Sequence, residues 1–219
     1  MKPTPLDILK TYWGYESFKT SQQDAIAFVL AGKDTCVFLP TGAGKSICFQ
    51  VPALVEAGIC IVISPLVALM QDQVENLKSR GIKAQLLKSG MPYKEIDQKL
   101  DNCVYGNYKF LYLSPERLQQ DLVQQRIAKM NVNFIVVDEA RCISQWGHDF
   151  RPEYRNLQRI IERIGVNIPI IGLTATATPK VQEDIIKNLG ITDATVFKSS
   201  FNRPNLFYEV RQCRGSRSS

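Results

Sequence analysis

The chain has 219 residues, of which 45% are hydrophobic and 22% charged, and it carries a formal net charge of +6. These values are ordinary for one large globular domain, and no apolar run reaches the ~20 residues that a membrane-spanning helix needs. The N-terminus lacks the apolar core of a signal peptide, so we expect a cytoplasmic protein. Three arginines lie within the last nine residues, and the remaining charge of +3 does not by itself establish a nucleic-acid partner.

Short runs rich in valine and isoleucine alternate with longer segments of helical pattern. In chain order we expect a helix at 21–31, a strand at 35–39, a helix at 45–57, a strand at 59–64, helices at 66–79 and 92–103, strands at 110–114 and 134–138, a helix at 153–164, a strand at 170–174 and a helix at 179–189. The strands are apolar on both faces, as in a parallel sheet covered by helices on both sides. The pattern predicts a three-layer α/β domain with a mainly parallel sheet over 1–208, followed by a disordered or vector-derived tail at 209–219.

A glycine-rich loop follows the first expected strand. Its residues are Thr41, Gly42, Ala43, Gly44, Lys45 and Ser46. Glycines let backbone N–H groups turn toward an anion, and the N-terminus of the following helix adds a favourable dipole. Lys45 is expected to reach the β- and γ-phosphates of a nucleotide, and Ser46 to bind Mg²⁺. Leu39 replaces the first glycine of the full phosphate-loop pattern, but the strand–loop–helix context favours a phosphate site over a chance glycine-rich turn.

An acidic pair, Asp138 and Glu139, ends the expected strand at 134–138. A carboxylate at the end of a buried strand is costly unless it is paired or bound to a metal ion. Together with a phosphate loop, the pair predicts that Asp138 binds Mg²⁺ and that Glu139 orients and deprotonates the attacking water. A solvated pair of strand-end carboxylates is the alternative.

The six cysteines and the single histidine do not form a metal-ligand pattern. No two cysteines lie two to four residues apart, so the sequence shows no zinc-ligand pair. We expect reduced thiols in the fold.

The order of the remaining motifs resembles that of superfamily 2 helicases. They are TGAGKS at 41–46, SPLVALMQDQV at 64–74, SPERL at 114–118, DEAR at 138–141 and TATAT at 174–178. The stretch CISQWGHDFRPEY at 142–154 resembles the aromatic-rich loop of RecQ helicases, and GYESFKTSQQDAI at 14–26 resembles their adenine-recognition segment. SSFNRPNL at 199–206 resembles the link to a second motor domain.

This resemblance implies the first RecA-like P-loop NTPase domain of a RecQ-like 3′→5′ DNA helicase. Such a protein uses ATP and Mg²⁺, acts on single-stranded DNA and duplex junctions in DNA repair and recombination, and is nucleoid-associated in a bacterium. The competing interpretations are a DEAD-box-like RNA helicase domain, a self-sufficient P-loop NTPase such as a small-molecule kinase, and a non-catalytic nucleic-acid-binding module.

The resemblance also assigns roles to single residues. Tyr15 would stack on adenine and Gln22 would read its edge, whereas Lys19 stands where the family usually has arginine, which weakens the expected adenine preference. The residues expected to contact DNA are Trp146, His148, Phe150, Arg151, Ser64, Gln71 and Ser114. Thr174 and Thr176 would hydrogen-bond the acidic pair and relay the nucleotide state.

Structural alternatives remain open for several of these residues. Phe18 is expected in the core, and core packing is the alternative for Trp146 and Phe150. Helix capping is the alternative for the serines and threonines.

Two departures from the family pattern affect the expected activity. Arg141 replaces the histidine of the DEAH motif, so we expect it to pair with an acid or a phosphate and to weaken the coupling of DNA binding to turnover. The 219 residues do not include the second motor domain, which supplies an arginine finger in the family. We therefore expect this chain alone to bind ATP, to hydrolyse it very slowly and not to unwind DNA.

Overall fold

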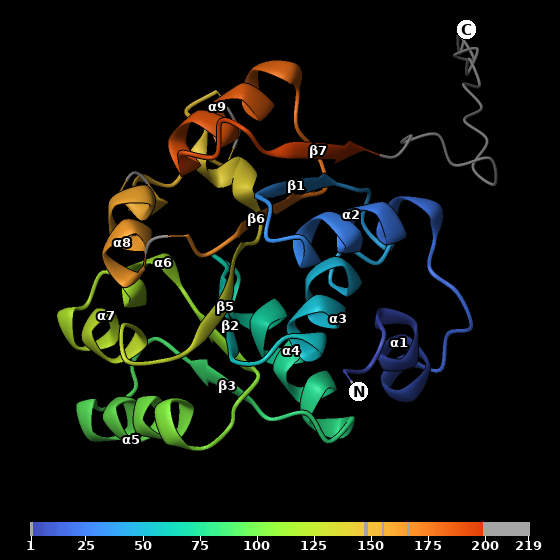
Figure 1. The fold of residues 1–219 in the computed structure, drawn as a ribbon. Coiled ribbons are helices and arrows are strands. Elements are labelled where there is room, and N and C mark those ends of the chain that lie inside the picture. The colour runs from blue at the N-terminus through green and yellow to red at the C-terminus, as the bar shows by residue number, and fades with distance from the viewer. Residues whose placement is uncertain (1, 147–148, 155, 166, 199–219) are drawn as a thin grey trace, which may run out of the picture.

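The computed structural model describes residues 2–146, 149–154, 156–165 and 167–198. In this part of the chain, seven parallel strands form one sheet in the order β3-β4-β2-β5-β6-β1-β7 (Figure 1). The strands are β1 (Thr35–Phe38), β2 (Ile59–Ile63), β3 (Ala84–Leu87), β4 (Phe110–Leu113), β5 (Val132–Val137), β6 (Ile170–Thr174) and β7 (Thr195–Lys198). Helices lie on both sides of the sheet, which confirms the expected three-layer α/β fold.

Strand side chains alternate between two apolar layers. On β2, Ile61 enters one core cluster, whereas its neighbours Cys60 and Val62 enter the other. The Ile61 layer is covered by α5 (Tyr93–Tyr105), α6 (Pro115–Leu118), α7 (Asp121–Ile127), α8 (Leu157–Ile164) and α9 (Pro179–Leu189). The other layer is covered by α2 (Thr20–Leu30), α3 (Ile47–Val55) and α4 (Val67–Ser79). Burial on both faces explains why the strands are continuous apolar runs in the sequence.

Several short elements were absent from the expected pattern. They are α1 (Pro5–Trp13), β3, α6, α7 and the edge strand β7. Helix α1 packs against α3 outside the main layers, and it begins with a capping box in which Thr4 and Asp7 exchange hydrogen bonds. The helix expected at 153–164 is a short 3-10 turn, η2 (Pro152–Tyr154), followed by α8, so that expectation was too long.

The sheet order determines which loops meet. Because every described strand pair is parallel, the carboxyl ends of the strands lie along one edge of the sheet, where α/β proteins bind their ligands. Adjacent strands β2, β5, β6 and β1 bring the segment after β2, the acidic pair, the TATAT segment and the glycine-rich loop to that edge.

Two expectations concern the ends and the membrane. The link segment at 199–206, the domain boundary at 208 and the tail at 209–219 lie outside the described residues, so they remain predictions. Among the described helices, none is both long and apolar enough to cross a bilayer.

Candidate nucleotide and nucleic-acid site

The loop between β1 and α3 has the backbone expected of a phosphate cradle. Gly42 and Gly44 have φ angles of 80° and 81°, in the left-handed region that favours glycine. Ser46 occupies the N-cap position of α3, so the loop opens onto a helix N-terminus. A Cβ atom on Gly44 would lie 2.4 Å from Nε2 of Gln22, which explains why the loop needs glycine there.

Two side chains bind main-chain carbonyl groups of the loop. Gln22 is only 5% exposed, and its Nε2 donates to the carbonyl oxygens of Ala43, at 3.2 Å, and Gly44, at 3.1 Å. Its Oε1 accepts from the backbone N of Lys19 at 3.0 Å, so the amide expected to read adenine is bonded within the protein. Nζ of Lys45 donates to the carbonyl oxygen of Leu39 at 3.1 Å. Because the acceptor is a main-chain carbonyl, Leu39 can form this bond as well as a glycine at that position could.

The charge of Lys45 depends on its surroundings. Burial lowers the pKa of its ammonium group, whereas the nearby carboxylates of Glu139 and Asp138 raise it. Lys45 is therefore close enough to the acidic pair to interact with its charge. The glycine-rich loop and the acidic pair meet at this edge of the sheet.

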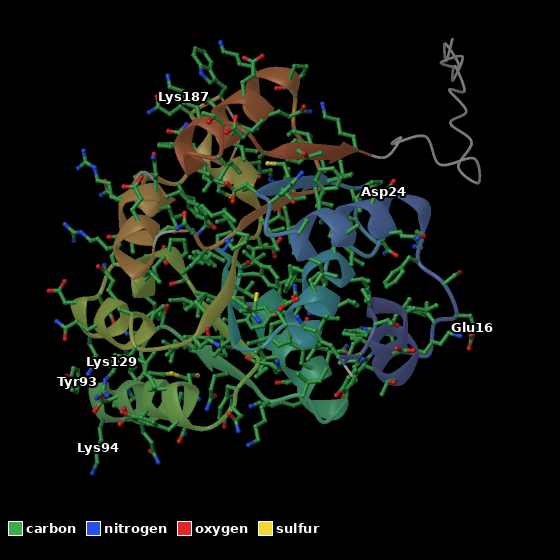
Figure 2. All side chains as sticks on the ribbon, viewed as in Figure 1. Glu16, Asp24, Tyr93, Lys94, Lys129 and Lys187 are labelled. Carbon is green, nitrogen blue, oxygen red and sulfur yellow. The ribbon has the colours of Figure 1, made fainter. Side chains whose placement is uncertain are left out.

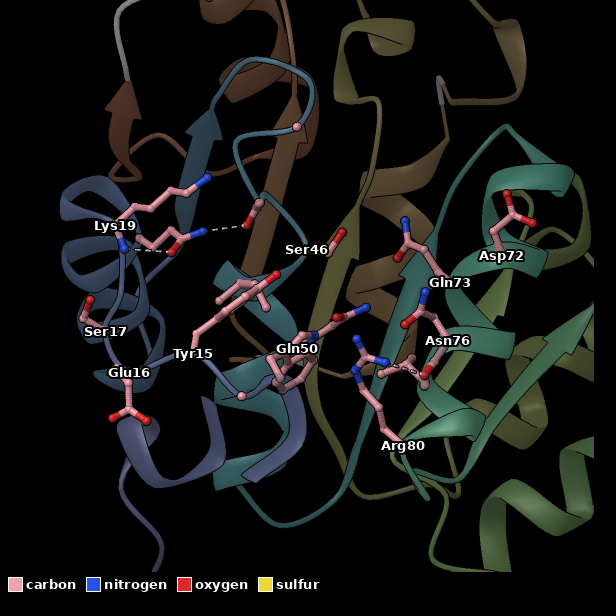
Figure 3. Close-up of a pocket in the computed structure, with 17 residues that line it drawn as sticks. Tyr15, Glu16, Ser17, Lys19, Ser46, Gln50, Asp72, Gln73, Asn76 and Arg80 are labelled. Carbon is pink, nitrogen blue, oxygen red and sulfur yellow. Dashed lines mark hydrogen bonds between the residues drawn. The ribbon is translucent and has the colours of Figure 1, made fainter. Parts of the chain in front are cut away.

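A pocket of about 800 Å³ opens beside the loop (Figure 3). One wall carries Tyr15 and Lys19 from the segment expected to recognise adenine, and Gln22, Gly42, Gly44, Ser46 and Gln50 also line the pocket. Tyr15 is 58% exposed, so its ring is available to a ligand. Phe18 instead packs against an apolar cluster between α1, α2 and α3, as expected.

The opposite wall of the pocket was not expected from the sequence. It consists of Asp72, Gln73 and Asn76 from α4 and of Arg80, the residue directly after that helix (Figure 3). Tyr112, on β4, donates to Oε1 of Gln73 at 3.0 Å and accepts from Nε2 of Gln50 at 3.2 Å, which joins α4 to α3 beneath the pocket. The sequence does contain this pattern, because Asp72, Asn76 and Arg80 follow one another at intervals of four residues, as side chains on one face of a helix do.

The acidic pair lies at the end of β5. Asp138 is 7% exposed, its Oδ1 accepts from the backbone N of Glu139 at 2.9 Å, and its Oδ2 accepts from the Ser64 hydroxyl at 3.5 Å. Burial, with the adjacent Glu139 charge, raises the pKa of Asp138 to about 6. Glu139 has φ 48° and ψ 43°, a left-handed conformation that non-glycine residues adopt rarely and that is often found at functional sites.

Arg141 lies between the acidic pair and the aromatic-rich loop. Its Nη1 is 3.1 Å from Oε2 of Glu139, and its Nε donates to Oδ2 of Asp149 at 2.9 Å. Of the two expected partners, an acid or a phosphate, the structure shows acids. A hollow of about 240 Å³ is lined by Glu139 and Arg141 together with Phe150, so the DEAR motif and the aromatic-rich loop share one surface.

The aromatic-rich loop is partly exposed. Trp146 is 65% exposed, so the core-packing alternative is wrong for this residue. Phe150 and Arg151 are half-buried and line the hollow beside Arg141, and the backbone N of Arg151 donates to the carbonyl oxygen of Cys142 at 2.9 Å. His148 lies outside the described residues, so its expected DNA contact remains a prediction.

Three of the expected DNA contacts were assigned to residues that have structural partners here. Ser64 is 1% exposed and its hydroxyl donates to Asp138 at 3.5 Å, so its side chain is turned into the protein here, and its expected DNA contact remains a prediction. Ser114 is buried and caps α6 by accepting from the backbone N of Arg117, as the capping alternative predicts. Gln71 is half-buried on α4 and bonds to Glu75 and Lys88.

The threonines after β6 also differ from expectation. Thr174 is fully buried and its hydroxyl donates to the carbonyl oxygen of Thr176 at 3.2 Å, because the chain turns directly after the strand. The expected hydrogen bond from Thr174 to the acidic pair is therefore wrong for this structure. Thr176 is exposed, and Thr178 caps α9 by accepting from the backbone N of Val181.

The donor set fits Mg²⁺ bound together with nucleotide phosphates. This ion usually keeps several waters and takes one or two protein oxygens beside phosphate oxygens. Ser46 supplies a hydroxyl and Asp138 a carboxylate, which among the described residues accepts hydrogen bonds from the Glu139 N–H and, at 3.5 Å, from the Ser64 hydroxyl. Within the described ranges, no group of three or more histidine, cysteine or acidic side chains could hold a metal ion by itself.

The five described cysteines are free and buried, and burial raises their pKa, as expected of reduced core thiols.

Comparison with known proteins agrees with this geometry. The family model for DEAD/DEAH box helicases matches residues 19–185. The ATP-dependent DNA helicase RecQ of Haemophilus influenzae is 43% identical over 211 residues, which cover 96% of this chain and 34% of the relative. The RecQ helicase of Bacillus subtilis is 44% identical over 204 residues, which cover 93% of this chain and 34% of the relative.

Solved structures show the same fold. The helicase MrfA bound to DNA has a TM-score of 0.72 at 19% identity, over 89% of this chain and 29% of that one. The Pyrococcus furiosus Hef helicase domain has a TM-score of 0.64 at 23% identity, over 84% of this chain and 38% of that one. This chain spans about a third of the length of the two RecQ relatives. Its resemblance to RecQ helicases is confirmed, and the chain belongs to the DEAD/DEAH box helicase family.

Proposed function

We propose that this chain is the ATP-binding motor domain of a RecQ-like 3′→5′ DNA helicase, which in a full-length parent couples ATP hydrolysis to DNA unwinding. The observation that supports this most strongly is the Arg141 bridge. One guanidinium contacts both the acidic pair beside the phosphate loop and the exposed aromatic-rich loop. A nucleotide site and a nucleic-acid site that share a side chain can influence each other.

The residues of the nucleotide pocket have separate tasks. Tyr15 offers a ring face to adenine, and Gln22 and Lys19 line the same pocket. Lys45 exchanges the Leu39 carbonyl for phosphate oxygens, which compensate its charge better than a neutral carbonyl does. Ser46 and Asp138 would hold Mg²⁺, which neutralises the phosphate charge. Glu139 accepts the proton of the attacking water.

Ion pairing at Glu139 has a consequence for turnover. Its Oε2 is engaged by Arg141, so the carboxylate is only partly available to water until that pair opens. An arginine finger from a second motor domain would complete the site, and its loss costs about 10³–10⁵ in rate in related NTPases. The 219 residues alone should therefore bind Mg·ATP, hydrolyse it very slowly and not unwind DNA.

DNA is the proposed nucleic-acid partner, as single strands and at duplex junctions. Support comes from the exposed Trp146 in a loop that resembles the RecQ aromatic-rich loop, and from relatives named as DNA helicases. We also propose a cytoplasmic, nucleoid-associated location, where a bacterial protein that acts on DNA would meet its substrate. A DEAD-box-like RNA helicase domain and a self-sufficient P-loop NTPase are not favoured, because the two relatives at 43–44% identity reported above are named as ATP-dependent DNA helicases.

A binding experiment tests the proposal. A fluorescent ATP analogue with Mg²⁺ is expected to bind this chain and to lose affinity in Lys45→Ala. A labelled oligo-dT is expected to bind more tightly than the matching oligo-rU. The Trp146→Ala variant is expected to lose affinity for both oligonucleotides. Nucleotide binding that ignores Lys45 would contradict the assigned pocket, and a preference for RNA would favour the DEAD-box alternative.

A further inference from the structure

The ring of Trp146 carries a cation on one side. Nζ of Lys180 lies 3.0 Å from the ring centroid, within the range of a cation–π interaction. The two residues are 34 positions apart in the sequence, and Lys180 is the second residue of α9. Trp146 nevertheless stays largely exposed, so the lysine does not bury the ring.

A second contact anchors the same loop to the same helix face. The hydroxyl of Ser144 donates to Oδ2 of Asp184 at 2.8 Å and accepts from the backbone N of Trp146 at 3.2 Å. Asp184 lies four residues after Lys180, so both side chains project from one face of α9. Helix α9 also packs against η1 (Ala140–Ile143), directly before the aromatic-rich segment. Trp146 is thus positioned by α9 through its ring and through its main chain.

The charge of Lys180 is not used by a carboxylate. Glu183 and Asp184 are within reach along the helix, but Asp184 is engaged by Ser144, and within the described ranges Lys180 forms no ion pair. A lysine in the first turn of a helix also opposes the helix dipole, so this position does not favour lysine for the sake of the helix. An exposed aromatic ring beside an unpaired cation is the combination that binds a base and its phosphate.

We propose that Lys180 is a nucleic-acid-binding residue that works together with Trp146. A base stacks on the ring, and the Lys180 ammonium group contacts the adjoining phosphate. Because α9 follows the TATAT segment at the end of β6, this contact would join that segment to the bound strand. The inference rests on the proposed function, because it requires the aromatic-rich loop to bind DNA.

The salt dependence of binding tests this contact. The probe is a fluorescein-labelled oligo-dT, and its anisotropy is measured with this chain at several NaCl concentrations. Lys180→Ala is expected to weaken binding about 3- to 10-fold and to reduce the slope of log affinity against log salt by about 0.7, which is one phosphate contact on a single strand. Lys180→Arg is expected to keep the parent slope, because it keeps the charge.

Lys187→Ala is the matched control. Lys187 is also exposed on α9, in its last turn, and its side chain points away from the body of the protein (Figure 2). This variant is expected to keep the parent slope, and all variants are expected to keep the parent unfolding temperature. A Lys180→Ala chain with parent affinity and slope, or a Lys180→Arg chain that loses as much as the alanine variant, would overturn the inference but leave the proposed function intact. Failure of the parent chain to bind oligo-dT even at low salt would instead contradict the proposed function, and the inference with it.

Discussion

Nη1 of Arg141 lies 3.1 Å from Oε2 of Glu139, the carboxylate proposed to deprotonate the attacking water. The same guanidinium donates to Asp149 in the aromatic-rich loop. Arginine stays charged and can only donate, whereas the histidine of the DEAH pattern can also accept and can be neutral. The arginine therefore pairs with both carboxylates and fixes a contact that histidine could form and release.

Replacement of Arg141 by histidine should loosen this bridge. In a chain that includes a second motor domain, we expect Arg141→His to increase the stimulation of ATP hydrolysis by single-stranded DNA at least severalfold. Nucleotide affinity should stay within about twofold, because Arg141 does not line the nucleotide pocket. Phosphate release with and without DNA measures the effect, and unchanged stimulation would contradict the role given to Arg141.

Replacement of Asp149 tests the other half of the bridge. Asp149→Asn removes the contact of Arg141 with the loop but leaves Arg141 paired with Glu139, so bound DNA could no longer open that pair and DNA stimulation should fall. The fold should not be impaired, because exposed ion pairs contribute only about 0–1 kcal/mol to stability. Urea unfolding measures the stability and phosphate release measures the stimulation. Loss of more than about 2 kcal/mol of unfolding free energy would show that the pair is mainly structural.

The buried carboxyl of Asp138 predicts a specific pH dependence of stability. Folding raises the pKa of this group from 3.8 to about 6, so the folded protein binds the proton more tightly than the unfolded chain does. The resulting stabilisation is complete below about pH 4 and is lost as the pH rises through about 6. Asp138→Asn should thus raise the free energy of unfolding at pH 8 by about 1–3 kcal/mol and leave it nearly unchanged at pH 4.

Urea unfolding at both pH values checks this prediction, with Asp24→Asn on the exposed side of α2 as the control for loss of one carboxyl. In a chain that includes a second motor domain, the same variant should lose Mg²⁺-dependent ATP hydrolysis, so the Asp138 carboxylate would destabilise the fold and still be needed for activity. Equal effects of Asp138→Asn at pH 4 and pH 8 would exclude the raised pKa as the cause.

The two glycines of the phosphate loop should differ in their response to alanine. Both have left-handed φ angles, so each substitution should cost about 1–2 kcal/mol. A Cβ on Gly42 would meet nothing within 4 Å, whereas one on Gly44 would displace the Gln22 amide and its two hydrogen bonds to the loop. Gly44→Ala should therefore destabilise the nucleotide-free chain by a further ~1–2 kcal/mol. Equal unfolding free energies for the two variants would show that Gln22 does not support the loop.

Much of the fold could be predicted because its strands are buried on both faces. The segment at 59–63 is entirely apolar, and the α/β alternation then implies parallel crossovers. Strand β3 escaped prediction because it is four residues long and contains Gln85. Helix α1 escaped because its capping box stabilises it locally, outside the α/β repeat.

Sequence motifs identified the residues of the site, but only the structure shows which of them contact one another. TGAGKS and DEAR named the residues at the edge of the sheet, and the sequence could not show that Ser64 turns toward Asp138 or that Thr174 bonds to its own turn. These choices depend on distances of a few ångströms between loops. The pairing of Trp146 with Lys180 was likewise not visible, because it joins segments that only the fold brings together.

Phosphate release by this chain with Mg·ATP, with and without single-stranded DNA, tests the central claim most directly, with Lys45→Ala as the control. The account predicts nucleotide binding that depends on Lys45 and negligible release in both conditions, because the arginine finger belongs to a second motor domain. Robust release that depends on Lys45 would contradict it and would show that the chain completes its own active site as a self-sufficient NTPase.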